Sequence, residues 1–101
     1  MDAKKKASLT QEQQVAADIG GRLVSGSGNG WAVKNDVRNR EWSIECKTTT
    51  RGSFSITAEA LKVAETNALM DNREMAFVVE MGGRQWALVT YENFLKLAQE
   101  R

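Results

Sequence analysis

The sequence contains no histidine and no proline, and Cys46 is its single cysteine. The missing histidine excludes every His-dependent catalytic triad and every histidine metal ligand. One cysteine cannot form an intrachain disulfide, which favours a reducing, cytoplasmic setting. A metal site in this chain must therefore be built from oxygen atoms, and such ligands favour Mg²⁺ or Mn²⁺ over Zn²⁺.

Long apolar runs are also missing. No stretch is long enough to span a membrane, and no apolar segment of the kind found in secretory signals follows the basic N-terminus. The 101 residues, 42% of them hydrophobic, indicate one globular domain over residues 9–101. Residues 1–8 are predicted to be a mobile basic arm, whose lysines are more typical of a solubilising tail than of a DNA contact.

The net charge of +1 is unevenly distributed along the chain. Residues 1–53 carry a net charge of +3, and residues 54–101 carry −2. This asymmetry favours, weakly, a polyanion as the partner of the first half. For any single Lys or Arg, an ordinary solvated surface charge is the simpler interpretation.

Hydrophobic periodicity, caps and glycines predict the order α-βββ-α-ββ-α, a fold of the α/β class with an α+β mixed sheet. The first helix is expected to start at Ser8 or Thr10 and to end before Gly20-Gly21. A glycine-rich loop over residues 26–30 is expected to follow the first strand. The later expected elements are strands 31–37 and 41–48, helix 57–71, strands 75–79 and 85–90, and helix 91–99.

The strand expected at residues 42–48 is the centre of the candidate site. Side chains alternate along a strand, so Glu45 and Lys47 share its polar face, while Cys46 points to the opposite face. A turn at residues 39–41 would bring Asp36 back beside Glu45. Two carboxylates beside a lysine suit a divalent cation together with a cationic partner for a phosphate or a water. An ordinary solvated ion pair between Glu45 and Lys47 is the alternative interpretation.

Several segments resemble the small archaeal and phage Holliday-junction resolvases of the PD-(D/E)xK nuclease superfamily. They are Gly20-Gly21-Arg22, Ser25-Gly26-Ser27-Gly28, Lys34-Asn35-Asp36-Val37-Arg38, Ile44-Glu45-Cys46-Lys47-Thr48-Thr49 and Ser53 to Ile56. The resemblance covers about residues 10–90, and the order of these segments is more specific than the D…ExK spacing alone. It implies a restriction-endonuclease-like core. The sequence departs from the pattern at Asn35, where many relatives have glycine.

Residue by residue, the resemblance implies a metal site and a DNA surface. Asp36, Glu45 and the backbone carbonyl of Cys46 would hold Mg²⁺, for which Mn²⁺ would substitute. Lys47 would orient or activate the attacking water, or stabilise charge on the phosphate. Glu12 matches the glutamate that completes the site, although its place in a first helical turn by itself favours dipole compensation. The implied DNA contacts are Arg22, Ser25, Ser27, Lys34, Arg38, Thr48 and Arg51.

The implied function is a metal-dependent endonuclease, encoded by a phage or a prokaryote, that cuts branched DNA such as four-way junctions. Two symmetric cuts require two sites, so a homodimer is expected. Apolar residues of the second half are expected to supply its interface: Phe77, Trp86, Leu88, Phe94 and Leu97. The alternatives are a related nuclease that acts on linear DNA and a non-catalytic DNA-binding protein on the same fold.

Overall fold

The computed structural model describes residues 2–24 and 34–100. Within these residues the element order is the predicted α-βββ-α-ββ-α. The elements are α1 (Ala3–Asp18), β1 (Arg22–Leu23), β2 (Val37–Arg38), β3 (Trp42–Thr48), α2 (Ala58–Met70), β4 (Glu74–Met81), β5 (Arg84–Val89) and α3 (Tyr91–Gln99). The predicted glycine-rich loop and the predicted DNA contacts Ser25 and Ser27 lie outside the described residues.

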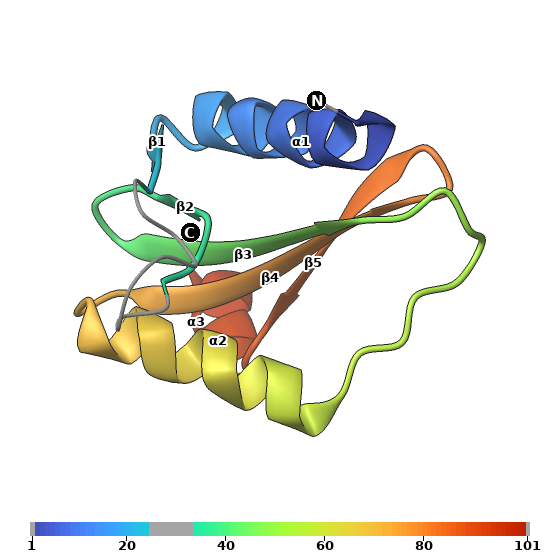
Figure 1. The fold of residues 1–101 in the computed structure, drawn as a ribbon. Coiled ribbons are helices and arrows are strands. Elements are labelled where there is room, and N and C mark those ends of the chain that lie inside the picture. Colours follow the sequence, from blue (N-terminus) through green and yellow to red (C-terminus); the bar gives the residue numbers. More distant parts are fainter. Residues whose placement is uncertain (1, 25–33, 101) are drawn as a thin grey trace.

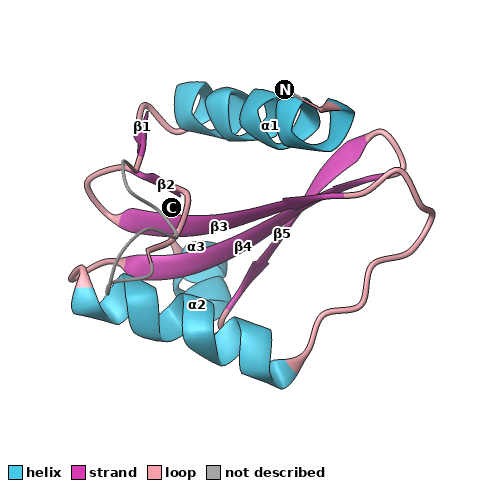
Figure 2. Ribbon diagram, viewed as in Figure 1, coloured by secondary structure: helices cyan, strands magenta, loops and turns pink. Residues whose placement is uncertain are grey.

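The five described strands form one mixed sheet in the order β1-β2-β3-β4-β5. β3 and β4 are parallel and joined through α2, whereas the other neighbouring pairs are antiparallel. The chain is thus an α+β protein in which a βαβ unit carries an antiparallel hairpin on each side (Figures 1 and 2). This arrangement places β3 in the centre of the sheet, between β2 and β4.

The helices α1 and α2 cover opposite faces of the sheet (Figure 1). On the α1 face, Val15 and Ala16 belong to one buried cluster with Ile44 and Cys46. On the α2 face, a second buried cluster contains Ala64, Ala68, Met75, Phe77 and Val79. Alternating side chains of β4 supply both clusters, and β3 adds Ile44 and Cys46 to the α1-face cluster. The predicted burial of Cys46 is thus confirmed.

The helix α1 begins at Ala3, earlier than the sequence analysis predicted. Its N-cap is Asp2, whose side-chain oxygen accepts a hydrogen bond from the Lys5 amide at 2.8 Å. The prediction of an arm over residues 1–8 is therefore corrected: residues 3–8 are helical and continuous with the domain. Alanine and lysine are good helix formers, so a capped start at Asp2 can extend the helix through this segment.

The end of α1 is fixed by two glycines, as predicted. Gly20 has a positive φ of 63°, and the Gly21 amide donates to the Ala16 carbonyl at 2.8 Å. A Cβ atom at Gly21 would collide with the backbone carbonyl of Arg38. The absence of a side chain at Gly21 thus lets the end of α1 pack closely against β2.

The predicted interface residues divide into buried and exposed ones. Phe77 is 2% exposed in the α2-face cluster, and Leu88 packs partly buried against the same cluster. Including Phe77 in an interface was wrong, because the core of the chain itself covers it, whereas Leu88 keeps part of its surface exposed. Trp86, Phe94 and Leu97 are 48%, 53% and 50% exposed. None of the described helices has the length and hydropathy needed to cross a membrane.

Candidate functional site

The hairpin of β2 and β3 brings Asp36 beside Glu45, as predicted. Val37 pairs with Ile44, and the Asp36 amide donates to the Ile44 carbonyl at 2.9 Å. The turn before β3 is set by Asn39, whose side-chain oxygen accepts from the amides of residues 41 and 42 at 2.9 and 2.7 Å. This local turn fixes the register, and the register fixes which side chains meet.

Glu45 lies between a like charge and an opposite one. Its carboxylate is 3.6 Å from the Lys47 ammonium and shares a hydrogen bond with the Asp36 carboxyl. Burial, followed by the charge and the hydrogen bond of Asp36, raises the pKa of Glu45 to about 7, and the opposing effect of Lys47 only partly offsets this rise. Two carboxyl groups this close favour a bound positive charge, whether a proton or a metal ion.

The backbone of Cys46 faces the same edge of β3 as Asp36. The Cys46 amide donates to Oδ2 of Asp36 at 2.9 Å. In an extended strand the N–H and C=O of one residue point to the same side, so the Cys46 carbonyl also faces this edge. The thiol points into the α1-face cluster, where burial and the neighbouring carboxylates raise its pKa. Cys46 therefore offers a carbonyl oxygen to the site rather than a thiolate.

Glu12 approaches the Asp36 carboxylate from α1. Its pKa is raised by burial and then by the negative charge of Asp36. The neighbouring Gln11, 2% exposed, holds this part of α1 in place. Its side-chain amide donates to the Lys47 carbonyl at 2.8 Å and to the Gln85 side chain at 3.2 Å.

The sequence analysis missed this role of Gln11. A signal was present, because Gln11 lies four residues before the buried Val15 and therefore on the inward face of α1.

The candidate site lies in one cleft of about 1020 Å³. The four predicted catalytic residues all lie on it: Glu12, Asp36, Glu45 and Lys47. The predicted DNA contacts Thr48 and Arg51 line it too, on the segment that leads from β3 toward α2. In Figure 1 this segment and the N-terminal end of α1 both lie toward the carboxyl end of β3. That end of a parallel strand is where α/β proteins commonly bind their ligands.

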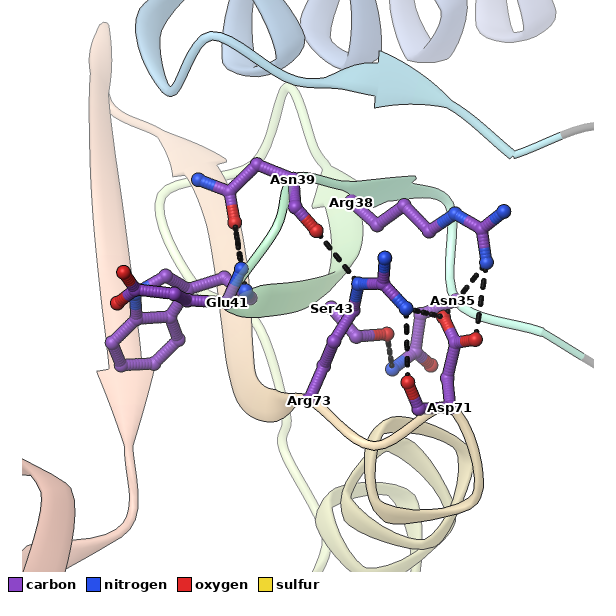
Figure 3. A network of polar contacts seen from close by, with 8 residues as sticks. Asn35, Arg38, Asn39, Glu41, Ser43, Asp71 and Arg73 are labelled. Atoms are coloured by element: carbon purple, nitrogen blue, oxygen red, sulfur yellow. Dashed lines mark hydrogen bonds and ion pairs between the residues drawn. The ribbon is translucent and has the colours of Figure 1, made fainter.

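Other predicted DNA contacts lie away from this cleft. Arg38 donates two hydrogen bonds to Asp71, both at 3.0 Å, and Arg73 approaches the same carboxylate at 3.2 Å (Figure 3). Arg38 and Lys34 line a separate cavity of about 180 Å³. Arg22 is exposed on β1, opposite Arg38 in the register. The structure therefore brings the predicted catalytic residues together but divides the predicted DNA contacts between two regions.

Asn35, the departure from the resolvase pattern, has a structural role. It is 2% exposed, and its side-chain amide donates to Oγ of Ser43 at 3.0 Å and to the Ala64 carbonyl at 2.9 Å. Asn67 of α2 donates back to its oxygen at 3.3 Å. These bonds tie the residue next to Asp36 to both β3 and α2, which a glycine could not do.

The oxygen atoms at this site fit a hard divalent cation that takes only some of its ligands from the protein. In residues 2–24 and 34–100, no three Asp, Glu or Cys side chains are grouped closely enough to form a metal-binding cluster. Asp36, Glu45 and the Cys46 carbonyl would supply oxygens and leave positions for water and substrate, as Mg²⁺ sites usually do. We found no match for the chain among protein families, curated proteins or solved structures. Its function must therefore be inferred from this cleft.

Proposed function

We propose that the chain is a metal-dependent DNA endonuclease built on a restriction-endonuclease-like core. One observation carries this proposal: Glu12 of α1, Asp36 next to β2, and Glu45 and Lys47 of β3 all line one cleft. A solvated ion pair between Glu45 and Lys47 would not require Asp36 to share a hydrogen bond with Glu45. Bringing like charges together is costly, and such arrangements are concentrated at functional sites.

In the proposed reaction the carboxylates and the lysine have different tasks. Asp36, Glu45 and the Cys46 carbonyl would hold Mg²⁺ or Mn²⁺, which supplies Lewis acidity for phosphodiester hydrolysis. Lys47, whose ammonium lies 3.6 Å from Glu45, would orient the attacking water or neutralise charge that develops on the phosphate. Glu12 lines the same cleft from α1, near enough to Asp36 to be affected by its charge, and would complete the acidic surroundings.

The proposed substrate is branched DNA, with the four-way junction as the preferred form. This part of the proposal depends on the resemblance to Holliday-junction resolvases and on the need for two symmetric sites. The exposed side chains of Trp86 on β5 and of Phe94 and Leu97 on α3 offer apolar contacts for a homodimer. β5 is an edge strand of the described sheet, which leaves its outer side open to a partner.

The decisive experiment compares a labelled four-way junction with a linear duplex made from the same arm sequences. Each is incubated with the chain in Mg²⁺, in Mn²⁺ and in chelator, with Asp36→Asn as the matched inactive control. We expect paired nicks in the junction that require the metal and Asp36. Equal cutting of duplex and junction would indicate a nuclease of linear DNA instead. Tight binding without any cutting would indicate a non-catalytic DNA-binding protein.

Light scattering tests the assembly separately. We expect the mass of a dimer at micromolar concentration. Replacing Trp86 with lysine should convert that dimer to monomer, because a charge on the exposed apolar surface opposes its burial. A wild-type monomer would contradict the homodimer.

A further inference from the structure

The first turns of α1 form one wall of the cleft. Lys4, Ser8 and Glu12 line it, and they are spaced four residues apart, so they share one face of the helix. Ala3 and Ala7 lie on the same wall. A segment that the sequence suggested to be a solubilising tail is thus a fixed part of the candidate site.

The cleft also has an ordered distribution of charge. The acidic side chains that line it, among the described residues, are Glu12, Asp36 and Glu45, and the basic ones are Lys4, Lys47 and Arg51. Lys47 is adjacent to Glu45, whereas Lys4 is two helical turns from Glu12. Hydroxyl groups line the rest of the cleft, from Thr48, Thr49, Thr50, Ser53 and Ser55, in addition to Ser8 on the α1 wall. Cations and hydroxyls without further acidic groups suit the oxygens of a phosphate backbone.

We infer that Lys4 and Ser8 form a second phosphate subsite, which binds the cleaved strand away from the phosphate that reacts. Eight residues of helix separate Lys4 from Glu12, a rise of about 12 Å. Successive phosphates of one strand of duplex DNA are about 3.4 Å apart along the axis. For α1 aligned with that axis, the contacted phosphate lies roughly three nucleotides from the cleaved bond. This inference rests on the proposed function, and it assigns the cleft a direction along the strand.

The chain provides a matched control for this subsite. Lys6 belongs to the same exposed helical segment as Lys4 and carries the same charge, but it does not line the cleft. Lys4→Ala and Lys6→Ala therefore change the net charge equally. Lys4→Arg keeps the charge at the wall and serves as the rescue variant.

Binding is measured by fluorescence anisotropy of labelled duplex and junction, in chelator, over a series of KCl concentrations. Lys4→Ala should reduce the slope of log K against log[salt] by about 0.9, the value for one lost phosphate contact on duplex DNA. Its affinity should fall about threefold to tenfold at moderate salt, with Lys6→Ala changing affinity less than about twofold. Lys4→Arg should restore both quantities. Equal effects of Lys4→Ala and Lys6→Ala would overturn the subsite.

A second measurement locates the subsite on the strand. Substrates are shortened one nucleotide at a time on each side of the cut, and single-turnover cleavage is followed in Mg²⁺. The wild type should lose rate when the phosphate about three nucleotides away is removed on one side, and Lys4→Ala should not respond to that removal. If Lys4→Ala weakens DNA binding and Lys6→Ala does not, but the wild type cleaves none of the substrates, the nuclease is overturned and the subsite is kept. Absence of DNA binding by the wild type would overturn both.

Discussion

The two ends of β3 balance their charges in opposite ways. At the amino end, Asp71 accepts a hydrogen bond from Arg38 and forms an ion pair with Arg73 (Figure 3). Arg73 also donates to the Asn39 carbonyl at 2.6 Å. At the carboxyl end, Asp36 and Glu45 share a hydrogen bond. One end joins opposite charges across the fold, whereas the other holds like charges together at a cleft. The first arrangement favours stability, and the second favours binding of a cation.

Neutralising the carboxylates of the cleft should have the largest effect on activity. We expect Asp36→Asn and Glu45→Gln each to reduce single-turnover cleavage in Mg²⁺ on the order of 10³-fold, because the cation would lose a charged ligand. Asp71→Asn, the same chemical change at the other end of β3, should leave the cleavage rate nearly unchanged. Full activity of either cleft variant would contradict the proposed site.

A substitution at Lys47 tests whether the ammonium group of this residue acts in DNA binding or in the reaction. Lys47→Ala should lower the cleavage rate about 10²-fold and leave DNA affinity within about twofold, since its role is in the transition state. Arg51→Ala removes a more remote cation from the same cleft and should weaken binding more than rate. The measurements are single-turnover cleavage in Mg²⁺ and anisotropy in chelator. A matching loss of affinity in Lys47→Ala would reduce Lys47 to a phosphate contact.

The amino end of β3 should show the converse behaviour. Asp71→Asn leaves two arginines without their carboxylate partner, so we expect the free energy of unfolding to fall by about 1–2 kcal/mol, a value discounted for partial exposure. Urea unfolding measures this change. Glu59→Gln, at an exposed acidic residue in the first turn of α2, is the control and should cost about 0.5 kcal/mol or less. Equal effects of the two variants would mean that the Asp71 network contributes little.

The pH dependence of stability gives the most specific effect. The pKa of Glu45 is raised to about 7, so the metal-free native state binds its proton more tightly than the unfolded chain does. Stability from this group is therefore present at pH 4 and is lost as the pH rises to 8. Glu45→Gln cannot lose a proton there, so it should become more stable than the wild type by about 1–2 kcal/mol at pH 8.

Urea unfolding in chelator at pH 5 and pH 8 measures this difference. Adding Mn²⁺ at pH 8 should stabilise the wild type and not Glu45→Gln, because the variant lacks one charged ligand. Parallel pH profiles for the two proteins would show that the Glu45 carboxyl does not titrate near neutral pH.

The carboxyl end of β3 could be predicted from sequence because its geometry is local. Strand alternation separates Cys46 from Glu45 and Lys47, and one turn sets the pairing that brings Asp36 to Glu45. The element order was likewise predictable from periodicity, caps and glycines. These features depend on residues that lie within about ten positions of one another.

The contacts that the sequence did not reveal join distant segments. Gln11 bonds to the Lys47 carbonyl across 36 positions, and Arg38 bonds to Asp71 across 33. Nothing in the local sequence distinguishes an arginine that pairs within the fold from one that meets a phosphate. The start of α1 was missed for another reason, because a lysine run is equally typical of a helix and of a disordered tail.

The opposed orientation of Cys46 has a consequence for recognising relatives of this chain. Cys46 is 7% exposed and packs in the cluster that contains Val15 and Ala16, so the space there limits the volume of its side chain and makes no use of its reactivity. Relatives should accept alanine or valine at this position and reject large or charged residues, while the residues on either side stay acidic and basic. A search profile can require an acidic residue at position 45, a small residue at position 46 and a basic residue at position 47. Such a profile would separate true relatives from chance occurrences of the same spacing.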